Sequence, residues 1–438
     1  MNLSSTLNGS LNGSLDCPGD KSISQRALMI CSLINESIQI SGFLNAEDPL
    51  STMNALNEMG AGITSHQNNV IKIHQKPMRF IKPSKSLDLG NSGTGLRLML
   101  GMTAGLGMPM NFVGDRSLSK RPMNRVLQPL RAMGAEINSE DGMLPITLKE
   151  SLLMDNFVYE LPVASAQVKS CILLAGLASR KSVTVIEPVQ TRDHTERMLK
   201  HFGANISVTQ QDTKNIIRLN NDLPLRAKDY HVVGDISSAA FLIVGALISK
   251  SERLKICGVG MNPSRIGILN VLKDMGAQIN VENLRVESNE PVADLVVLPS
   301  ILKGITIDGS IIPNVIDEIP IISIAAAFAE GDTIIRDAAE LRVKESDRLS
   351  AVSDGLLALG IKHENFDDGM KIHGNSRLLD LSEPVTIDSH HDHRIAMSFL
   401  IAGLNCNQSI TVKECKNIFT SFPNFLELSA SLGYQIEK

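Results

Sequence analysis

Tryptophan is absent from the 438-residue chain, and aromatic residues make up only 3% of it. Platforms that stack bases or sugar rings depend on aromatic side chains, so proteins of these kinds are disfavoured. An excess of positive charge is also absent, because 42 Lys and Arg stand against 47 Asp and Glu, a net charge of -5. We therefore expect no nucleic-acid partner, and an anionic ligand would require a local cluster of cations.

Long hydrophobic runs and paired cysteines are missing as well. The apolar stretch at residues 319–329 is far shorter than the roughly 20 residues that span a membrane. The N-terminal sequence MNLSSTLNGSLNGSLDC lacks the basic and apolar regions of a secretory signal. The six cysteines show no CxxC spacing, which favours reduced thiols and disfavours zinc. These features predict a cytoplasmic protein with no membrane partner and no bound metal.

An internal repeat of about 70 residues organises the chain. An amphipathic helical pattern that ends in a glycine and precedes a β-like run recurs six times, at Gly60, Gly134, Gly203, Gly276, Gly360 and Gly433. A glycine just after a helix is typical of a residue with positive φ. A second, almost wholly apolar helix is expected in each unit, and these helices should be buried. They begin near Ser22, Thr94, Ala166, Ser237, Glu318 and His391. Six units suggest two similar domains of three units each.

Unusual polar residues gather at the start of each apolar helix. Helix N-termini carry unpaired N–H groups and a partial positive charge, so several such ends in one place would bind anions. The glycine-rich loop at residues 89–97 fits this role, but Leu96 stands where a P-loop has its lysine. The other polar segments lie at residues 18–26, 115–122, 163–170, 191–196, 317–318, 341–348 and 389–394.

Each of these segments also has a purely structural interpretation. Ser22 and Ser165 could simply cap helices, and the glycine-rich and basic segments could be solvated turns. Asp317 and Glu318 could complement a helix dipole. Three histidines and an aspartate at residues 389–394 suggest a metal site, but adjacent residues do not share one helix face, so we predict no metal there.

Taken together and in this order, the motifs resemble the 5-enolpyruvylshikimate-3-phosphate synthase family. The motifs are PGDKS with a following arginine, LGNSGTG.R, RPM, ASAQVKS, IDE.P, RVKESDRL and DHR. Details such as SAQ and GDRSLSKRPM are similar to the branch that includes glyphosate-tolerant bacterial enzymes. The resemblance implies an α/β (α+β) fold, the enolpyruvyl transferase fold or inverse α/β barrel. It has two similar domains, each of three βαβαββ units with buried parallel helices.

The resemblance also implies a domain division and an activity. Residues 1–20 with 235–438 would form domain I, residues 21–234 would form domain II, and the active site would lie in the interdomain cleft. The enzyme would transfer the enolpyruvyl group of phosphoenolpyruvate to the 5-hydroxyl of shikimate 3-phosphate and release phosphate. This step belongs to the shikimate pathway to chorismate and aromatic amino acids. We expect a monomer that needs no cofactor and whose partners are these two small molecules.

Three sets of site residues follow from the resemblance. Shikimate 3-phosphate would contact Lys21, Ser22, Arg26, Ser165, Ala166 through its backbone, Gln167, Arg192, Asp317 and Lys344. Phosphoenolpyruvate would contact Lys21, Asn91, Gly93, Arg121, Gln167, Arg348 and Arg394. The catalytic residues would be Lys21, Asp317 and Glu345.

These residue types suit the chemistry. The two substrates bring roughly five or six negative charges, which call for several cations. The planar fork of arginine binds two oxygens of a carboxylate or phosphate at once. Glu345 is the candidate acid for the methylene carbon, and Asp317 is the candidate base for the 5-hydroxyl. The division of proton transfers among Lys21, Asp317 and Glu345 stays open, and domain closure that excludes water is expected.

The chain departs from the family pattern at three positions. Thr420 stands where the family often has a lysine, so a cation is missing there or is supplied elsewhere, for example by Lys416. Ala166 replaces a common serine, which leaves only a backbone contact. Gly93 lacks the methyl group that narrows the phosphoenolpyruvate pocket in resistant relatives, so we expect sensitivity to glyphosate.

Two other functions remain as alternatives. The enolpyruvyl transferase that acts on UDP-N-acetylglucosamine shares the six-unit fold, but it uses a loop cysteine, and none lies between Cys31 and Cys171. A non-catalytic repeat scaffold that binds anions would not need Asp317 and Glu345.

Overall fold

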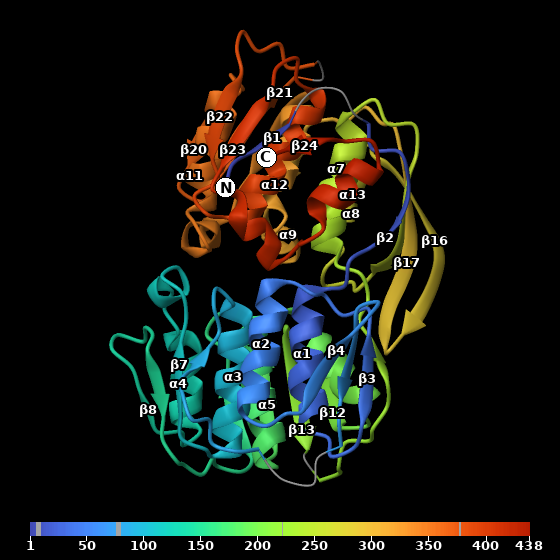
Figure 1. Cartoon of the computed structure of the whole chain (residues 1–438). Coiled ribbons are helices and arrows are strands. Elements are labelled where there is room, and N and C mark those ends of the chain that lie inside the picture. The colour runs from blue at the N-terminus through green and yellow to red at the C-terminus, as the bar shows by residue number, and fades with distance from the viewer. Residues whose placement is uncertain (6–9, 76–79, 221, 376–377) are drawn as a thin grey trace. The chain divides into compact units, whose positions relative to one another are not determined.

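The computed structural model describes residues 1–5, 10–75, 80–220, 222–375 and 378–438. Helices and strands alternate along the chain, so the fold is mixed α/β (Figure 1). The chain divides into two units. Unit 1 contains Met1–Pro18, Gly234–Arg285 and Pro291–Lys438, and unit 2 contains Gly19–Val233 and Val286–Glu290.

Two kinds of helix recur along the described chain, as the repeat predicts. The apolar, buried helices are α1 (Lys21–Ser32), α3 (Gly93–Leu106), α5 (Ala166–Ser179), α7 (Ile236–Ile248), α10 (Ile319–Ala327) and α12 (His393–Ala402). The second helices are α2 (Glu47–Glu58), α4 (Asn124–Ala132), α6 (His194–His201), α8 (Gly267–Asp274), α11 (Arg348–Ala358) and α13 (Phe425–Ser431). Shorter turns are α9 (Ile312–Val315), η1 (Leu118–Lys120), η2 (Gly309–Ile311), η3 (Ala339–Val343), η4 (Gly403–Asn405) and η5 (Cys415–Thr420).

The strands of the described chain form six four-stranded sheets, three in each unit. In unit 2 the sheet orders are β14 (Tyr230–His231), β3 (Ile38–Ser41), β5 (Val70–Ile73), β4 (Ile63–His66); β6 (Leu87–Asp88), β7 (Met110–Val113), β9 (Ile146–Leu148), β8 (Ile137–Asn138); and β10 (Phe157–Glu160), β11 (Val183–Glu187), β13 (Lys214–Asn220), β12 (Asn205–Gln211). In unit 1 they are β16 (Gln278–Glu287), β17 (Glu290–Leu298), β15 (Leu254–Gly260), β2 (Gly13–Asp16); β18 (Thr306–Ile307), β19 (Gly331–Ile335), β21 (Gly369–Gly374), β20 (His363–Phe366); and β22 (Val385–Asp388), β23 (Ile410–Lys413), β1 (Leu3–Ser5), β24 (Ile436–Glu437).

In every sheet of the described chain one outer strand runs parallel to its neighbour. Where the four strands follow one another along the chain, as β10 to β13 do, a buried helix joins the parallel pair and a second helix leads into the antiparallel pair. Such a parallel pair needs a crossover, and the buried helix provides it. In two other sheets the parallel partners, β14 with β3 and β2 with β15, come from distant parts of the chain. The βαβαββ repeat predicted from the sequence is therefore confirmed.

The six repeat glycines have the conformation that the sequence predicts. Each lies just beyond the C-cap of a second helix, and φ ranges from 68° at Gly360 to 107° at Gly134. Side chains with a Cβ rarely adopt this left-handed region, whereas glycine does so at little cost. These glycines end the helices and turn the chain into the following strand.

Both ends of the chain belong to the same sheet of unit 1. Leu3 in β1 pairs with Val412 in β23, and Ser4 pairs with Glu437 in β24. The N-terminal strand thus completes the sixth repeat, which begins more than 380 residues later with β22.

The units differ slightly from the domain boundaries expected from the sequence. Asp20 belongs to unit 2 because its N–H donates to the Val233 carbonyl (2.8 Å), and Gly234 belongs to unit 1 because its N–H donates to the Gly258 carbonyl (2.9 Å). Val286–Glu290 belongs to unit 2, where Asn289 Nδ2 donates to the Arg197 carbonyl (3.0 Å). Residues 6–9, 76–79, 221 and 376–377 of the expected domains lie outside the described residues.

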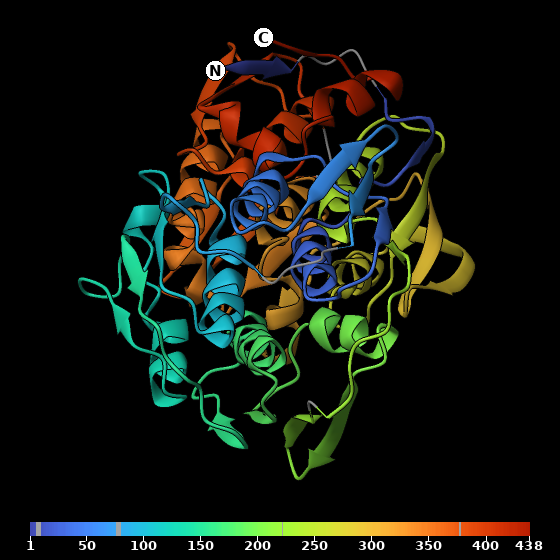
Figure 2. The same ribbon diagram turned by 60° about the horizontal axis from the view of Figure 1, so that its bottom comes forward.

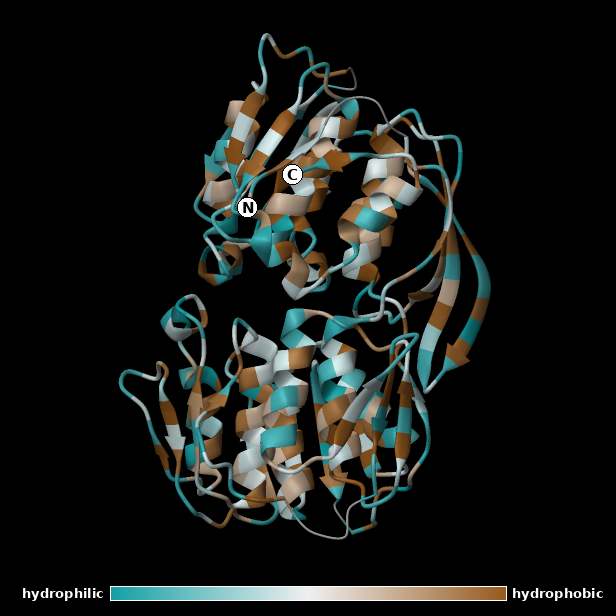
Figure 3. Cartoon of the chain, in the orientation of Figure 1, coloured by the Kyte–Doolittle hydropathy of each residue, from teal (hydrophilic) through white to brown (hydrophobic). Residues whose placement is uncertain are grey.

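The core of unit 2 lies among its buried helices. Figure 2 shows these blue to green helices nearly end-on, with the strands of the unit outside them. Alternate residues of β11 are buried, and its neighbours on the other face are half-exposed. Figure 3 shows the same alternation of hydrophobic and hydrophilic residues along several strands. This pattern is typical of a sheet with one face packed on helices.

Two glycines let α3 and α5 pack closely. A Cβ on Gly101 would lie 2.2 Å from the Cys171 carbonyl oxygen, and one on Gly105 would lie 2.4 Å from that of Ala175. We expect Gly101→Ala to lower the free energy of unfolding by about 2 kcal/mol or more, because the helices must move apart. Urea unfolding followed by circular dichroism measures this change. Leu152→Ala is the control, since Leu152 is 93% exposed, and an equal loss in both variants would contradict the prediction.

Among the described residues, no single helix is long and apolar enough to cross a membrane. By length and composition alone, one bent pair passes that test, Gly309–Val315 with Ile319–Ala327, and its two parts meet at 109°.

Candidate functional site

In unit 2, the first two turns of α1 carry two of the predicted cations, Lys21 and Arg26. Asp20 caps the helix, because its Oδ1 accepts the Ile23 N–H at 2.8 Å. The interpretation of Ser22 as the cap was wrong, since the helix begins one residue before it. Lys21 therefore sits at the first helical position, and its Nζ lies 3.1 Å from Asp48 Oδ2. The Ser22 carbonyl accepts a hydrogen bond from Arg26 Nη1 at 2.9 Å.

Arg26 is almost completely buried, with 3% of the residue exposed. Its Nε donates to Thr195 Oγ1 (2.9 Å) and its Nη2 donates to Ser170 Oγ (3.1 Å). The hydroxyl groups on α5 and α6 thus hold the guanidinium of Arg26 in one orientation, together with the Ser22 carbonyl.

The glycine-rich loop leads into α3, and Arg121 folds back onto it. Ser92 caps the helix by accepting the Gly95 N–H at 3.0 Å. Arg121 Nη2 donates to Asn91 Oδ1 (2.8 Å), which ties a cation to the loop. A Cβ added at Gly93 would lie 3.3 Å from Arg121 Nη1, so a larger residue there would press on the same cation.

The start of α5 carries three predicted residues. Ser165 is the N-cap, so the interpretation that this serine caps a helix is confirmed, and Ala166 is the first helical residue. Gln167 Nε2 donates to Thr94 Oγ1 (3.0 Å), and its Oε1 accepts from Arg97 Nη1 (2.9 Å). Backbone N–H groups and a side-chain amide are thus presented at one helix end.

Arg192 lies in the segment between β11 and α6. It precedes Asp193, the N-cap residue of α6, and is half-buried. The predicted cations of unit 2 are thus Lys21, Arg26, Arg121 and Arg192.

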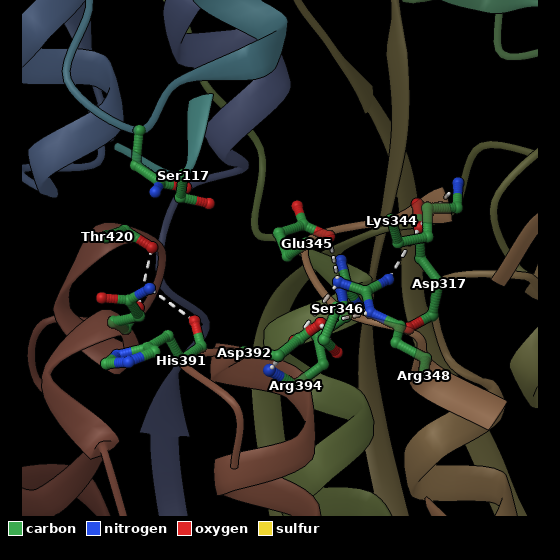
Figure 4. A network of polar contacts seen from close by, with 12 residues as sticks. Ser117, Asp317, Lys344, Glu345, Ser346, Arg348, His391, Asp392, Arg394 and Thr420 are labelled. Carbon is green, nitrogen blue, oxygen red and sulfur yellow. Dashed lines mark hydrogen bonds and ion pairs between the residues drawn. The ribbon is translucent and has the colours of Figure 1, made fainter. Parts of the chain in front are cut away.

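In unit 1, five predicted residues form a charged network (Figure 4). Asp317 Oδ1 lies 3.6 Å from Lys344 Nζ and 3.4 Å from Arg348 Nη1. Glu345 Oε2 lies 2.6 Å from Arg348 Nη2. Arg394 Nη1 donates to the Asp317 carbonyl at 2.9 Å. Two carboxylates and three cations therefore share one cluster.

Arg348 is the centre of this network, with 1% of its side chain exposed. Its Nε also contacts Asp392 Oδ2 at 2.8 Å. Burial opposes the charged form, but Asp392, Glu345 and Asp317 outweigh burial and raise the pKa of the guanidinium above its usual value. Arg348 thus stays positively charged.

Sequence reasoning did not select three residues that hold predicted ones in place. Arg97 contacts Gln167, and Asp392 contacts Arg348. Glu318 Oε1 lies 3.3 Å from Arg394 Nη1 and also accepts a hydrogen bond from the Ser237 hydroxyl. All three lie within the quoted motifs, and the rule that a buried cation needs a polar partner could have found the two carboxylates.

Comparison with known proteins gives the family. The model of the EPSP synthase family, described as 3-phosphoshikimate 1-carboxyvinyltransferase, matches residues 6–428. This chain belongs to the EPSP synthase family. A relative from Ruthia magnifica subsp. Calyptogena magnifica, named 3-phosphoshikimate 1-carboxyvinyltransferase, is 47% identical over 98% of this chain and 97% of its own length. One from Coxiella burnetii with the same name is 44% identical over 98% and 96%.

Solved structures agree with this assignment. The EPSP synthase from Acinetobacter baumannii has a TM-score of 0.87 and 42% identity, over 100% of this chain and 99% of its own. The enolpyruvyl transferase NikO from Streptomyces tendae has a TM-score of 0.76 over 99% and 98%, and its 18% identity shows a shared fold alone. The resemblance to the EPSP synthase family and the expected fold class are confirmed.

As a member of the EPSP synthase family, this chain has an uncharged residue where a lysine is common. Thr420 ends η5, is 5% exposed, and donates its hydroxyl hydrogen bond to the Asn417 carbonyl (2.7 Å). Asn417 in turn donates to the His391 carbonyl. Lys416 is exposed on the same short helix. Whether Lys416 supplies the missing cation stays a prediction.

Two buried cysteines and the histidines at residues 389–394 can be placed in the described part of the chain. Burial raises the pKa of the Cys31 and Cys171 thiols far above the usual range, so both stay protonated. Of the histidines at 390, 391 and 393, only His393 is buried. In the described chain, no group of three His, Cys, Asp or Glu side chains is arranged to hold a metal.

Proposed function

We propose that this protein transfers the enolpyruvyl group of phosphoenolpyruvate to the 5-hydroxyl of shikimate 3-phosphate, with release of phosphate. Membership of the EPSP synthase family over residues 6–428 carries the proposal. The relatives that bear the enzyme name match this chain over its whole length, so the activity belongs to the whole chain. The sister reaction on UDP-N-acetylglucosamine is the less favoured alternative.

Binding requires the cations of both units. In this proposal Ser22 and Arg26 hold shikimate 3-phosphate, and Arg192 with the N-terminus of α5 contacts its phosphate group. Arg121, Arg348 and Arg394 hold phosphoenolpyruvate, with Asn91, Gly93 and Gln167 nearby. Lys21 contacts both substrates, and Lys344 contacts the ring hydroxyls.

Glu345 is the proposed proton donor to the methylene carbon. Glu345 Oε2 lies 2.6 Å from Arg348 Nη2, and Arg348 is one of the proposed ligands of phosphoenolpyruvate. An anionic substrate that binds the Nη atoms of Arg348 would therefore lie next to the carboxyl group of Glu345.

The reaction then proceeds in two stages. Glu345 gives a proton to the methylene carbon, the electron pair of the double bond forms the new C–H bond, and the neighbouring carbon becomes cationic. The 5-hydroxyl oxygen attacks that carbon, and its proton passes to Asp317. In the second stage the methyl carbon returns a proton to Glu345, and the electron pair of that C–H bond re-forms the double bond. The C–O bond to the phosphate group breaks with its electron pair on the phosphate oxygen, and the proton held by Asp317 passes to the departing phosphate.

A phosphate-release assay tests the activity. We expect release when shikimate 3-phosphate and phosphoenolpyruvate are both present, and none with UDP-N-acetylglucosamine as acceptor. Release with phosphoenolpyruvate and UDP-N-acetylglucosamine, but not with phosphoenolpyruvate and shikimate 3-phosphate, would favour the sister reaction. An Asp317→Ala protein that keeps its full turnover would favour the anion-binding scaffold.

Glyphosate provides a second, independent test. Gly93 leaves space beside Arg97 Nη1 and Arg121 Nη1, which a Cβ would approach to 3.1 and 3.3 Å. We expect wild-type protein to be inhibited well below millimolar glyphosate, and Gly93→Ala to be inhibited less while its KM for phosphoenolpyruvate rises. An inhibition curve of the wild type that stays flat into the millimolar range would refute the prediction.

The proposal includes a monomer that acts in the cytoplasm on these small molecules without a cofactor. Light scattering of the purified protein tests the oligomeric state, and dialysis against a chelator before assay tests the absence of a metal requirement.

A further inference from the structure

Unit 2 buries a second group of charges that the proposed reaction does not use. Lys169 in α5, Glu187 at the end of β11 and Glu196 in α6 are exposed by 1%, 2% and 3% of their side chains. Lys169 Nζ lies 3.1 Å from Glu187 and 2.7 Å from Glu196 Oε1. We call these three residues the Lys169 cluster.

The Lys169 cluster contacts the segment that carries Arg192. Glu187 and Glu196 flank residues 188–193, and Lys169 Nζ lies 3.5 Å from the Thr191 carbonyl inside that segment. The Thr191 hydroxyl donates to Glu187 Oε2 at 2.7 Å. Lys169 therefore contacts residues before, within and after the segment that contains Arg192.

The cluster is also adjacent to the residues that hold Arg26. Ser170 follows Lys169 in the sequence, and Thr195 precedes Glu196. The hydroxyl groups of Ser170 and Thr195 both accept hydrogen bonds from Arg26. Thr195 Oγ1 also donates to Ser170 Oγ at 2.8 Å. A shift of α6 relative to α5 would therefore move the partners of Arg26.

Stability alone does not account for this arrangement. Burial raises the pKa of Glu196 despite Lys169, and Glu196 Oε2 has no hydrogen-bond partner among the described residues. Two carboxylates and one ammonium leave a formal charge of -1 in the interior. Apolar side chains of similar size often fill such positions at equal or lower free energy. A role in placing the neighbouring cations explains why charges stand there.

We propose that Lys169 is a positioning residue, which fixes Arg192 and the neighbouring Arg26 in the geometry that binds shikimate 3-phosphate, with Arg192 at its phosphate group. This inference rests on the proposed function. Because Arg192 lies in the segment that contacts Lys169 and would act on the phosphate, loss of Lys169 should weaken phosphate recognition most.

Calorimetry with two ligands isolates that effect, since shikimate 3-phosphate and shikimate differ only in the phosphate group. We expect Lys169→Met to weaken binding of shikimate 3-phosphate by about tenfold to a hundredfold, as loss of a placed charged contact does, while binding of shikimate changes little. In turnover, KM for shikimate 3-phosphate should rise more than KM for phosphoenolpyruvate. Compared with Lys169→Met, Lys169→Arg should restore part of the preference for shikimate 3-phosphate over shikimate.

Further variants separate positioning from folding. Lys169→Met combined with Glu196→Gln keeps the formal charge of the cluster at -1, and Thr191→Val removes a hydroxyl but no charge. The same selective loss, smaller in Thr191→Val, is expected in each variant whose circular dichroism matches the wild type. Lys214→Met is the control, because Lys214 forms an exposed ion pair with Glu160 in the same unit and should leave the ligand preference unchanged.

The results distinguish this inference from the proposed function. A wild-type protein without turnover would overturn both. An active wild type whose folded variants keep the full preference for shikimate 3-phosphate over shikimate would overturn only the role of Lys169. Equal loss of both ligands would likewise contradict it, because general damage to unit 2 would explain that result.

Discussion

Replacing Glu345 by glutamine is expected to lower kcat by about 100-fold or more, the usual loss when a positioned acid is removed. Glutamine is close to glutamate in size and can still contact Arg348, so the charged network should keep its shape. It cannot give a proton to the methylene carbon. Steady-state kinetics with both substrates varied will show whether the loss lies in kcat and leaves the two KM values little changed.

Glu340 offers a matched control for this change. Its Oε1 lies 3.5 Å from Lys344 Nζ, and 48% of its side chain is exposed. Glu340→Gln removes the same charge at the edge of the network, so we expect kcat close to that of the wild type. If the two variants lose activity to the same degree, the charge of the network and not an acid at residue 345 is what matters.

Arg348→Lys is expected to reduce kcat/KM for phosphoenolpyruvate by about 100-fold, while KM for shikimate 3-phosphate changes much less. Lysine keeps the charge but not the planar fork, so it cannot satisfy Asp392 and also present two donors to a carboxylate. The contact of 2.8 Å between Arg348 Nε and Asp392 shows that one edge of the fork is already committed to the protein.

The control for this variant is Arg342→Lys. Arg342 Nη1 lies 3.0 Å from Asp347, and its side chain is 36% exposed. Its Nε and Nη2 donate to the Asp367 and Phe366 carbonyls, so the change alters a partly exposed ion pair and two hydrogen bonds to the backbone and leaves the contacts of Arg348 in place. We expect little change in either KM. Comparable increases in both KM values for Arg348→Lys would mean that the network, and not recognition of phosphoenolpyruvate, had been damaged.

Local rules predicted the repeating part of the fold. The glycines after the second helices take positive φ because residues with a Cβ rarely can, and this preference depends only on the residue itself. The buried helices are apolar on almost every face, a pattern that needs no tertiary information. The motifs at the starts of these helices likewise carried enough information to identify the family.

The local analysis failed where neighbours compete for one role. Ser22 and Asp20 are both able to cap α1, and the aspartate does so because the helix starts at Lys21. The start itself depends on long-range pairing, since the Asp20 N–H is held by the Val233 carbonyl. A window of ten residues contains no sign of that contact.

The sequence by itself determined the six repeats, the family and the residue types that we propose for binding two anionic substrates, because periodicity, glycine conformation and motif order are properties of the chain alone. Only the tertiary structure decided which charges are neighbours. Lys169 meets Glu187 and Glu196, and Arg348 meets Asp392, across separate helices and strands. Such pairs form because a buried charge must find an opposite charge nearby, and which charges are nearby depends on how the helices pack.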